Sequence, residues 1–104
     1  MSVLLEFAMF PTDKGESVSE YVSQIIKMIH DSGSDYQLTP MGTIIETDTL
    51  SQAMTLVESA YQVLDDAGCD RVYSSLKLDI RKGKNNRLKG KVESVRNRIG
   101  DVHC

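Results

Sequence analysis

The feature of this sequence that most constrains its fold is the order in which two periodicities alternate. Apolar residues recur every three or four positions between residues 16 and 32 and again between residues 53 and 67, which places them on one face of a helix. A mostly apolar run at residues 2–10 precedes the first helical segment, and two short strand-like runs joined by a Pro-Met-Gly turn separate the two helical segments. From Arg71 to Arg81 the pattern changes to a period of two, which predicts a strand.

Local signals support these segments and add a third helix. Gly33 and Gly68 are natural helix stops, and Asp48 or Thr49 can cap the second helix. After the loop at residues 83–86, a narrow apolar stripe on a basic segment predicts a C-terminal helix that docks at an edge; the stripe is Leu88, Val92, Val95 and Ile99. The order β-α-β-β-α-β predicts an α+β, ferredoxin-like sandwich, with two helices on one face of a four-stranded antiparallel sheet.

Length and composition indicate one domain spanning residues 1–104. The chain is 40% apolar and 26% charged, which excludes a disordered or fibrous protein. No apolar run approaches the roughly 20 residues of a membrane helix. The N-terminal run is interrupted by Glu6 and lacks a basic leader, so we interpret it as a strand rather than a signal peptide and expect a cytoplasmic protein.

Charge is unevenly distributed along the chain. Residues 77–98 hold nine Lys or Arg against two acidic residues, whereas the remainder holds three against thirteen, within a net charge of −3. Such asymmetry can mark an anion or nucleic-acid patch, a solvated helix, or a contact with an acidic neighbouring subunit. The segment lacks interleaved aromatic residues, so we do not expect nucleic acid as the partner.

Strand parity predicts a mixed character for the sheet face that the helices leave open. In the last strand Val72, Leu76, Leu78 and Ile80 should face the helices, and Thr43, Ile45 and Thr47 should do so in the third strand. The open face then receives Leu4, Glu6, Ala8, Gly42, Ile44, Glu46, Tyr73, Ser75, Lys77 and Asp79. A solvated face does not need the apolar members, and a core does not tolerate unpaired charges. We therefore expect a subunit interface that also holds a polar ligand.

Three residues suit a small heterocyclic ligand, each with a plainer alternative. Glu46 can accept hydrogen bonds from a ligand amine, or it can form an interface salt bridge with Lys77. Thr43 follows Gly42 at a strand entry and offers a hydroxyl, or it is there for its β-propensity. Tyr36 can stack on a flat ring, or it packs in the core or an interface. We interpret Glu6 as structural, paired with Lys77 or with a partner's Arg.

No motif independently indicates an enzyme or a metal protein. The chain has no GxGxxG, no Walker-type loop, no HExxH and no EF-hand loop. His30 fits the negative end of the first helix and is interpreted as a surface residue. Cys69 and Cys104 are expected to be free thiols, and the terminal His103-Cys104 pair is too small a ligand set for a metal site.

Longer stretches carry a resemblance to a known family. The segments FAMFP, HDSGSDYQLTPMGTIIE, DRVYSSLKLDIR and LKGKVESVR together span nearly the whole chain. With them the sequence resembles the small thiamine-binding protein family. The resemblance implies a ferredoxin-like fold, sheets that associate into dimers and a dimer of dimers, and binding of thiamine or its pyrimidine moiety without catalysis or a required cofactor. It also implies a set of ligand contacts: Tyr36, Met41, Thr43, Glu46, Ser75 and Lys77.

The sequence departs from the family pattern at three places. Ala8 replaces a small hydroxyl residue, Thr47 replaces a glycine, and Asp79-Ile80-Arg81 replaces a pair of acids before the strand-end arginine. We therefore expect ligand affinity or ligand identity to differ from the family's. We expect a thiamine carrier, buffer or sensor. The alternatives are an interaction module without a ligand and an enzyme acting on a thiamine precursor, which lacks a visible base or nucleophile.

Overall fold

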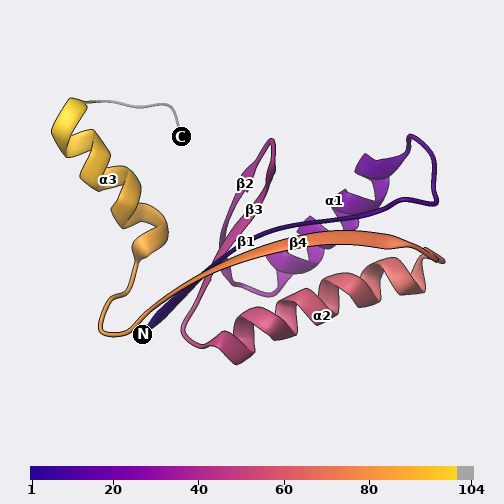
Figure 1. Ribbon diagram of the computed structural model, residues 1–104, viewed down its shortest axis with the longest axis horizontal. Helices are drawn as coiled ribbons and strands as arrows, with labels where there is room; N and C mark the ends of the chain where they lie inside the picture. Colours follow the sequence, from indigo (N-terminus) through magenta and orange to yellow (C-terminus); the bar gives the residue numbers. More distant parts are fainter. Residues whose placement is uncertain (101–104) are drawn as a thin grey trace.

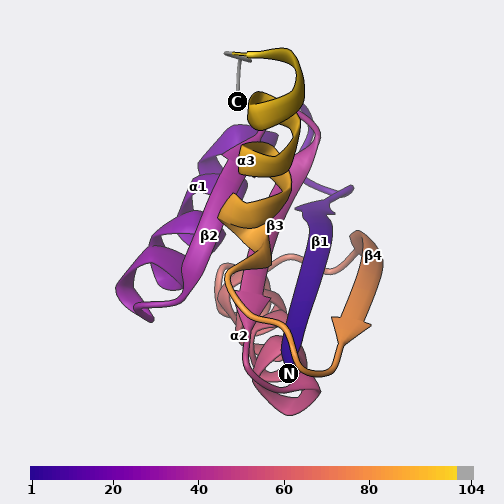
Figure 2. The same cartoon turned by 90° about the vertical axis from the view of Figure 1, so that its left-hand side faces the viewer.

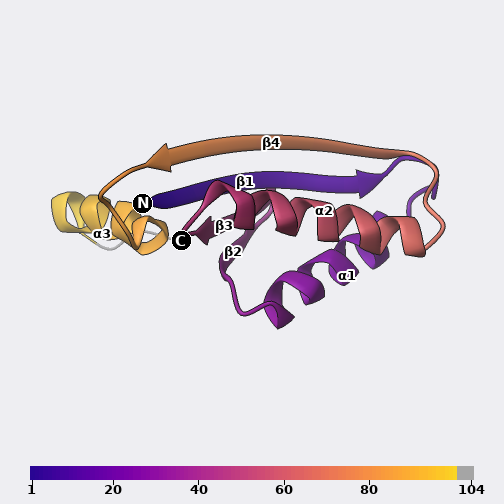
Figure 3. The same ribbon diagram turned by 90° about the horizontal axis from the view of Figure 1, so that it is seen from below.

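The computed structural model describes residues 1–100 and contains a four-stranded antiparallel sheet with two helices on one face (Figure 3). The elements are β1 (Ser2–Pro11), α1 (Val18–Asp31), β2 (Asp35–Thr39), β3 (Gly42–Thr47), α2 (Leu50–Asp66), β4 (Val72–Arg81) and α3 (Arg87–Ile99). The strands lie in the order β2-β3-β1-β4 (Figure 2), which confirms the predicted ferredoxin-like arrangement. The His103-Cys104 pair lies outside the described residues.

The predicted cap and stop residues set the helix boundaries. Thr49, rather than Asp48, caps α2: its hydroxyl accepts from the Gln52 amide at 3.2 Å, and the Gln52 side chain accepts from the Thr49 amide at 3.2 Å. This reciprocal pair is a capping box. Gly33 and Gly68 follow α1 and α2 with φ of 78° and 81°, a left-handed conformation that ends a helix at little cost for glycine.

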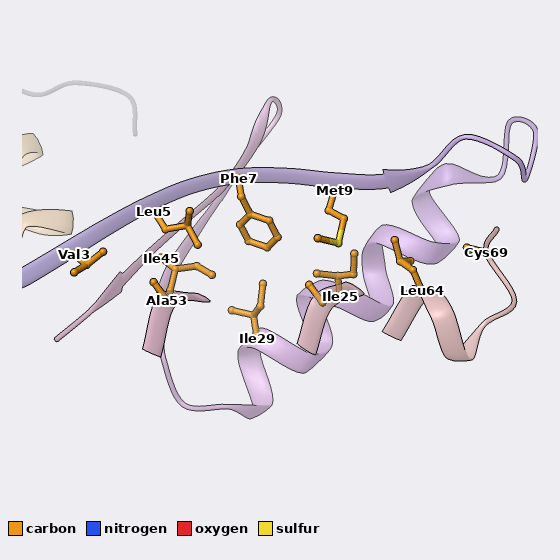
Figure 4. Close-up of a cluster of buried hydrophobic side chains, with 11 residues drawn as sticks. Val3, Leu5, Phe7, Met9, Ile25, Ile29, Ile45, Ala53, Leu64 and Cys69 are labelled. Atoms are coloured by element: carbon orange, nitrogen blue, oxygen red, sulfur yellow. The ribbon is translucent and has the colours of Figure 1, made fainter. Parts of the chain in front are cut away.

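The core lies between β1 and the two helices (Figure 4). Alternate residues of β1 point toward the helices, and Ile45 of β3 joins them from the neighbouring strand. They pack against Ile25 and Ile29 of α1 and against the small residues Ala53 and Ala60 of α2. The β1 residues in this cluster are Val3, Leu5, Phe7 and Met9. The predicted assignment of alternate β1 and β3 residues to the helix-facing side is thereby confirmed.

Strand β4 obeys the predicted parity but is poorly covered. Leu76, Leu78 and Ile80 lie opposite Phe7, Leu5 and Val3, so they share the helix-facing side of the sheet. They nevertheless remain 39%, 42% and 45% exposed. Strand β4 is an edge strand, and α2 packs mainly on β1 and β3. The structure therefore has an uncovered apolar strip beside α2.

Helix α3 lies beyond one end of the sheet, next to the N-terminus (Figures 1 and 2). The helix packs against β1, β2 and β3, and Arg87 at its start is buried. The apolar stripe becomes steadily more exposed toward the C-terminal end, reaching 72% at Ile99. The helix therefore docks at the end of the sheet, across three strands, rather than along one edge strand.

Candidate functional site

A hollow of about 300 Å³ opens between the β2–β3 hairpin, the second half of β1 and helix α1. We call it the hairpin hollow. Its lining is residues 7–10, residues 38–43, Val22, Ile25 and Ile26. Most of these side chains are apolar, and Thr39 and Thr43 add hydroxyl groups. A mostly apolar cavity with few polar groups, at the lower end of the usual size range, is typical of a small-molecule site.

The hairpin hollow exists because β3 is shorter than β1. Pairing between β1 and β3 ends at Phe7 and Thr43, whereas pairing between β1 and β4 continues to Pro11 and Val72. Within residues 1–100, the β3 side of β1 beyond Phe7 therefore borders the hollow and has no strand beside it. A strand edge presents backbone N–H and C=O groups in fixed directions, which can bind a planar polar ring.

The hairpin turn is held by Thr39 and Gly42. The Thr39 hydroxyl donates to the Gly42 carbonyl at 2.8 Å and accepts from the amides of Met41 and Gly42 at 3.2 and 3.1 Å. A Cβ on Gly42 would lie 2.9 Å from the Phe7 carbonyl oxygen, so only glycine permits this approach of β3 to β1. The Pro-Met-Gly-Thr motif thus builds one wall of the hollow and leaves Met41 89% exposed.

Glu46 has a structural role that neither of its two sequence-based interpretations included. Its carboxylate accepts hydrogen bonds from the backbone amides of Arg87 at 2.9 Å and Leu88 at 3.1 Å, and from the Ser2 hydroxyl at 2.5 Å. A strand residue therefore caps the N-terminus of α3, whose own N-cap residue Asn86 makes no side-chain cap. Burial raises the pKa of Glu46, but these hydrogen bonds and the charge of Arg87 outweigh it and hold the pKa below its ordinary value.

Arg87 completes this junction, and sequence reasoning missed it. Its guanidinium lies 2.9 Å from a carboxylate oxygen of Asp79 and donates to the backbone carbonyls of Ser2 at 2.7 Å and Asp79 at 2.5 Å. The side chain is 3% exposed. A buried arginine is stable only with such partners. Its place directly after the Gly-Lys-Asn-Asn loop gave no signal, because its contacts lie 8 and 85 residues away.

The other predicted contacts fall into separate places. Met41 and Thr43 line the hairpin hollow. Tyr36 and Glu46 line a second hollow of about 340 Å³ beside the start of α3, with Asp35 and Lys89 among its other members. The Tyr36 hydroxyl lies 2.8 Å from His30 Nδ1.

Ser75 and Lys77 lie on the open face of β4, outside both of these hollows. The Lys77 ammonium lies 3.7 Å from Glu6, which is one of the two pairings predicted for Glu6. The six predicted contacts therefore do not meet in one pocket of a single chain.

Two negative findings concern the described part of the chain. Within residues 1–100, no group of three or more His, Cys, Asp or Glu side chains is arranged to hold a metal ion. None of the helices described is long and apolar enough to cross a membrane.

Cys69 is buried, and this burial raises the pKa of its thiol, which favours an inert protonated form.

Known sequences resemble this chain over most of its length. The sequence profile of a family described as "Thiamine-binding protein" matches residues 5–96. A "UPF0045 protein" of Mycobacterium tuberculosis is 37% identical over 95 residues, 91% of this chain and 92% of that protein. Another, from Methanothermobacter thermautotrophicus, is 36% identical over 83 residues, 80% of this chain and 84% of that protein.

Solved structures share the fold. A hypothetical protein of Methanocaldococcus jannaschii has a TM-score of 0.77 at 36% identity, with 90% of this chain and 95% of that chain covered. A Thermotoga maritima protein provisionally assigned to thiamine biosynthesis or salvage has a TM-score of 0.78 at 21% identity, with 92% and 100% covered. At that identity the second likeness supports the fold alone.

Proposed function

Because the chain belongs to the thiamine-binding protein family, we propose that it binds thiamine or the related hydroxymethylpyrimidine without catalysing a reaction. It would serve in the cytoplasm as a carrier, buffer or sensor. The observation that carries this proposal is the match over residues 5–96, which contains the whole hairpin hollow.

The hairpin hollow suits the aminopyrimidine ring of thiamine. The ring is flat and apolar on its faces, and Val22, Ile25 and Ile26 provide an apolar wall of α1. Its edge carries an amine donor beside a ring nitrogen acceptor, which complements the backbone C=O and N–H groups of a strand. We place the ring edge against β1 beyond Phe7, within reach of the Thr43 hydroxyl.

Ala8 should lower the affinity of the hairpin hollow for the proposed ligand. This residue lines the hairpin hollow and lies opposite Ser75 in the pairing of β1 with β4. The resemblance places a hydroxyl residue at position 8, so the methyl group of Ala8 removes a polar contact. Directly opposite residues have their Cβ atoms roughly 5 Å apart. Ser75 therefore offers a hydroxyl beside Ala8 on the open face, outside the hairpin hollow, and we propose that it contacts a ligand that extends past Ala8.

Calorimetric titration with thiamine tests the proposal. Thr43→Val keeps the side-chain shape but removes the hydroxyl, and we expect a roughly fivefold to tenfold loss of affinity. Ala8→Ser restores a hydroxyl and should raise affinity by a similar factor. Lys82→Gln, in the exposed loop after β4, is the control. Absence of binding by thiamine, its phosphates and the free pyrimidine at millimolar concentration would exclude this ligand class.

We also propose that the protein self-associates, as a dimer or tetramer, through the apolar strip of β4. Leu76, Leu78 and Ile80 are exposed on the helix side, and exposed residues of α2 spaced four and seven apart extend this surface. The α2 members are Leu50, Met54 and Tyr61. Leu56 lines a hollow with Gly33, so its flank of α2 faces α1. Met54 and Tyr61 lie on the other flank of the helix, which is the β4 side.

The same exposed surface favours a second candidate function, an interaction module without a small-molecule ligand. The two candidates differ in one measurement. Native mass spectrometry of freshly purified protein reports both the number of subunits and any retained small molecule. Assembly without a retained or added thiamine-like ligand would favour the interaction module.

A further inference from the structure

A further hollow lies between the loop that follows β4 and the exposed side of α3. It measures about 400 Å³, and its walls include Arg81, Lys84, Gly90, Ser94 and Val95, together with the buried Arg87. We call it the loop hollow. Its position next to the start of β1, where Arg81 lies opposite Ser2, separates it from the hairpin hollow near the other end of β1.

Positive charge in the loop hollow exceeds what the fold uses. Arg87 is neutralised by Asp79 and held by backbone carbonyls, so it serves the junction of α3. Arg81 and Lys84 are exposed, and neither forms an ion pair among residues 1–100. Two uncommitted cations thus border a concave surface, where their fields add and attract anions.

Gly90 keeps the loop hollow open. It lies in the first half of α3, where glycine is among the poorest helix formers. Its φ is outside the left-handed region, and a Cβ built there meets nothing within 4 Å. Neither backbone geometry nor packing therefore requires glycine. Its effect is to leave the helix backbone bare where it lines the hollow.

The remaining lining defines the ligand. Val95 and the methylene chains of Arg81 and Lys84 offer an apolar wall, and Ser94 adds a hydroxyl group. Arginine forms paired hydrogen bonds with phosphate oxygens, and lysine binds phosphate as a point charge. We propose that the loop hollow binds a small organic phosphate, a monoester or a diphosphate, with the phosphate between Arg81 and Lys84 and the organic part toward Val95.

Titration of the full chain with pyrophosphate tests this site. We expect saturable binding by calorimetry and movement of the backbone amide signals of Gly90 and Ser94 in NMR spectra. The double variant Arg81→Gln/Lys84→Gln should bind roughly a hundredfold more weakly, about tenfold for each charged hydrogen-bond donor. The control Lys82→Gln/Arg98→Gln removes the same charge from exposed positions outside the hollow. It should change affinity by less than about threefold.

A second variant distinguishes binding in a shaped site from binding by a diffuse positive field. Gly90→Ala leaves every charge in place but fills part of the hollow, so we expect pyrophosphate affinity to fall several-fold while the melting temperature rises. Three results would overturn the proposal: no saturable binding at millimolar pyrophosphate, equal losses in the two double variants, or binding of polynucleotides alone. None of these depends on the thiamine titration.

Discussion

At the residue scale, Glu46 lies on the predicted face of the sheet but has partners that the sequence did not predict. Strand parity correctly places it on the face opposite Ile45, but its partners are Ser2 and the first amides of α3. Those amides lie 41 and 42 residues further along the chain, so no local sequence pattern predicts these hydrogen bonds. The acid lies one residue before the end of β3, where its carboxylate meets the first amides of α3.

Glu46→Gln should destabilise the protein by about 1–2 kcal/mol at neutral pH, since it weakens charge-assisted bonds to a helix terminus. The sign of the pH dependence follows from the lowered pKa. The folded state binds fewer protons than the unfolded chain, so the stabilisation is complete above the ordinary value of 4.5 and is lost as the pH falls through the lower, folded-state pKa. Urea unfolding at neutral and acidic pH measures it. Glu58→Gln, an exposed acid of α2, is the control, and a difference independent of pH would contradict this role.

Gly42 provides a second prediction at this scale. Gly42→Ala should cost about 1–3 kcal/mol, because the new Cβ would lie 2.9 Å from a backbone oxygen that cannot rotate away. Thermal unfolding checks the loss, and thiamine titration checks whether the altered hairpin still forms the hollow. A melting temperature equal to the wild type would show that β1 and β3 separate without cost.

At the element scale, the sequence predicts what periodicity and caps determine. The alternation of Val3, Leu5, Phe7 and Met9 faces the helices as expected, and Gly33 and Gly68 follow α1 and α2. Burial could not be predicted for β4, because parity tells which side a residue faces but not whether another element covers that side. The hollows were also unpredictable, since they depend on the unequal lengths of β1 and β3 and on where α3 docks.

Helix α3 gives a prediction that is the counterpart of Gly42→Ala. Gly90→Ala should stabilise the protein by up to about 1 kcal/mol, because alanine is the better helix former and its Cβ meets no atom within 4 Å. The same substitution therefore has opposite signs in β3 and in α3. Thermal unfolding of both variants compares them directly. Destabilisation by Gly90→Ala would mean that another chain or molecule occupies the space beside Gly90.

At the scale of the whole molecule, uncovered apolar surface and segregated charge both indicate self-association. Strand β4 presents an outer edge ten residues long, and α2 carries three acidic residues and no Lys or Arg. Edges of this length invite pairing with another chain unless they are covered. The apolar residues on either side of that edge would then be buried, and a second copy supplies the same surface in return.

Leu78→Lys tests this assembly. The side chain is 42% exposed, so lysine should be tolerated by the fold while placing a charge in the centre of the proposed contact. We expect sedimentation to report a smaller species than the wild type, with the circular dichroism spectrum unchanged. Thr55→Lys adds the same charge to an exposed position of α2 and should leave the mass unaltered. A wild-type protein that sediments as a monomer, or a Leu78→Lys variant that assembles normally, would exclude the β4 surface as the interface. If assembly also completes the ligand site, Leu78→Lys should weaken thiamine binding although Leu78 lies outside the hairpin hollow.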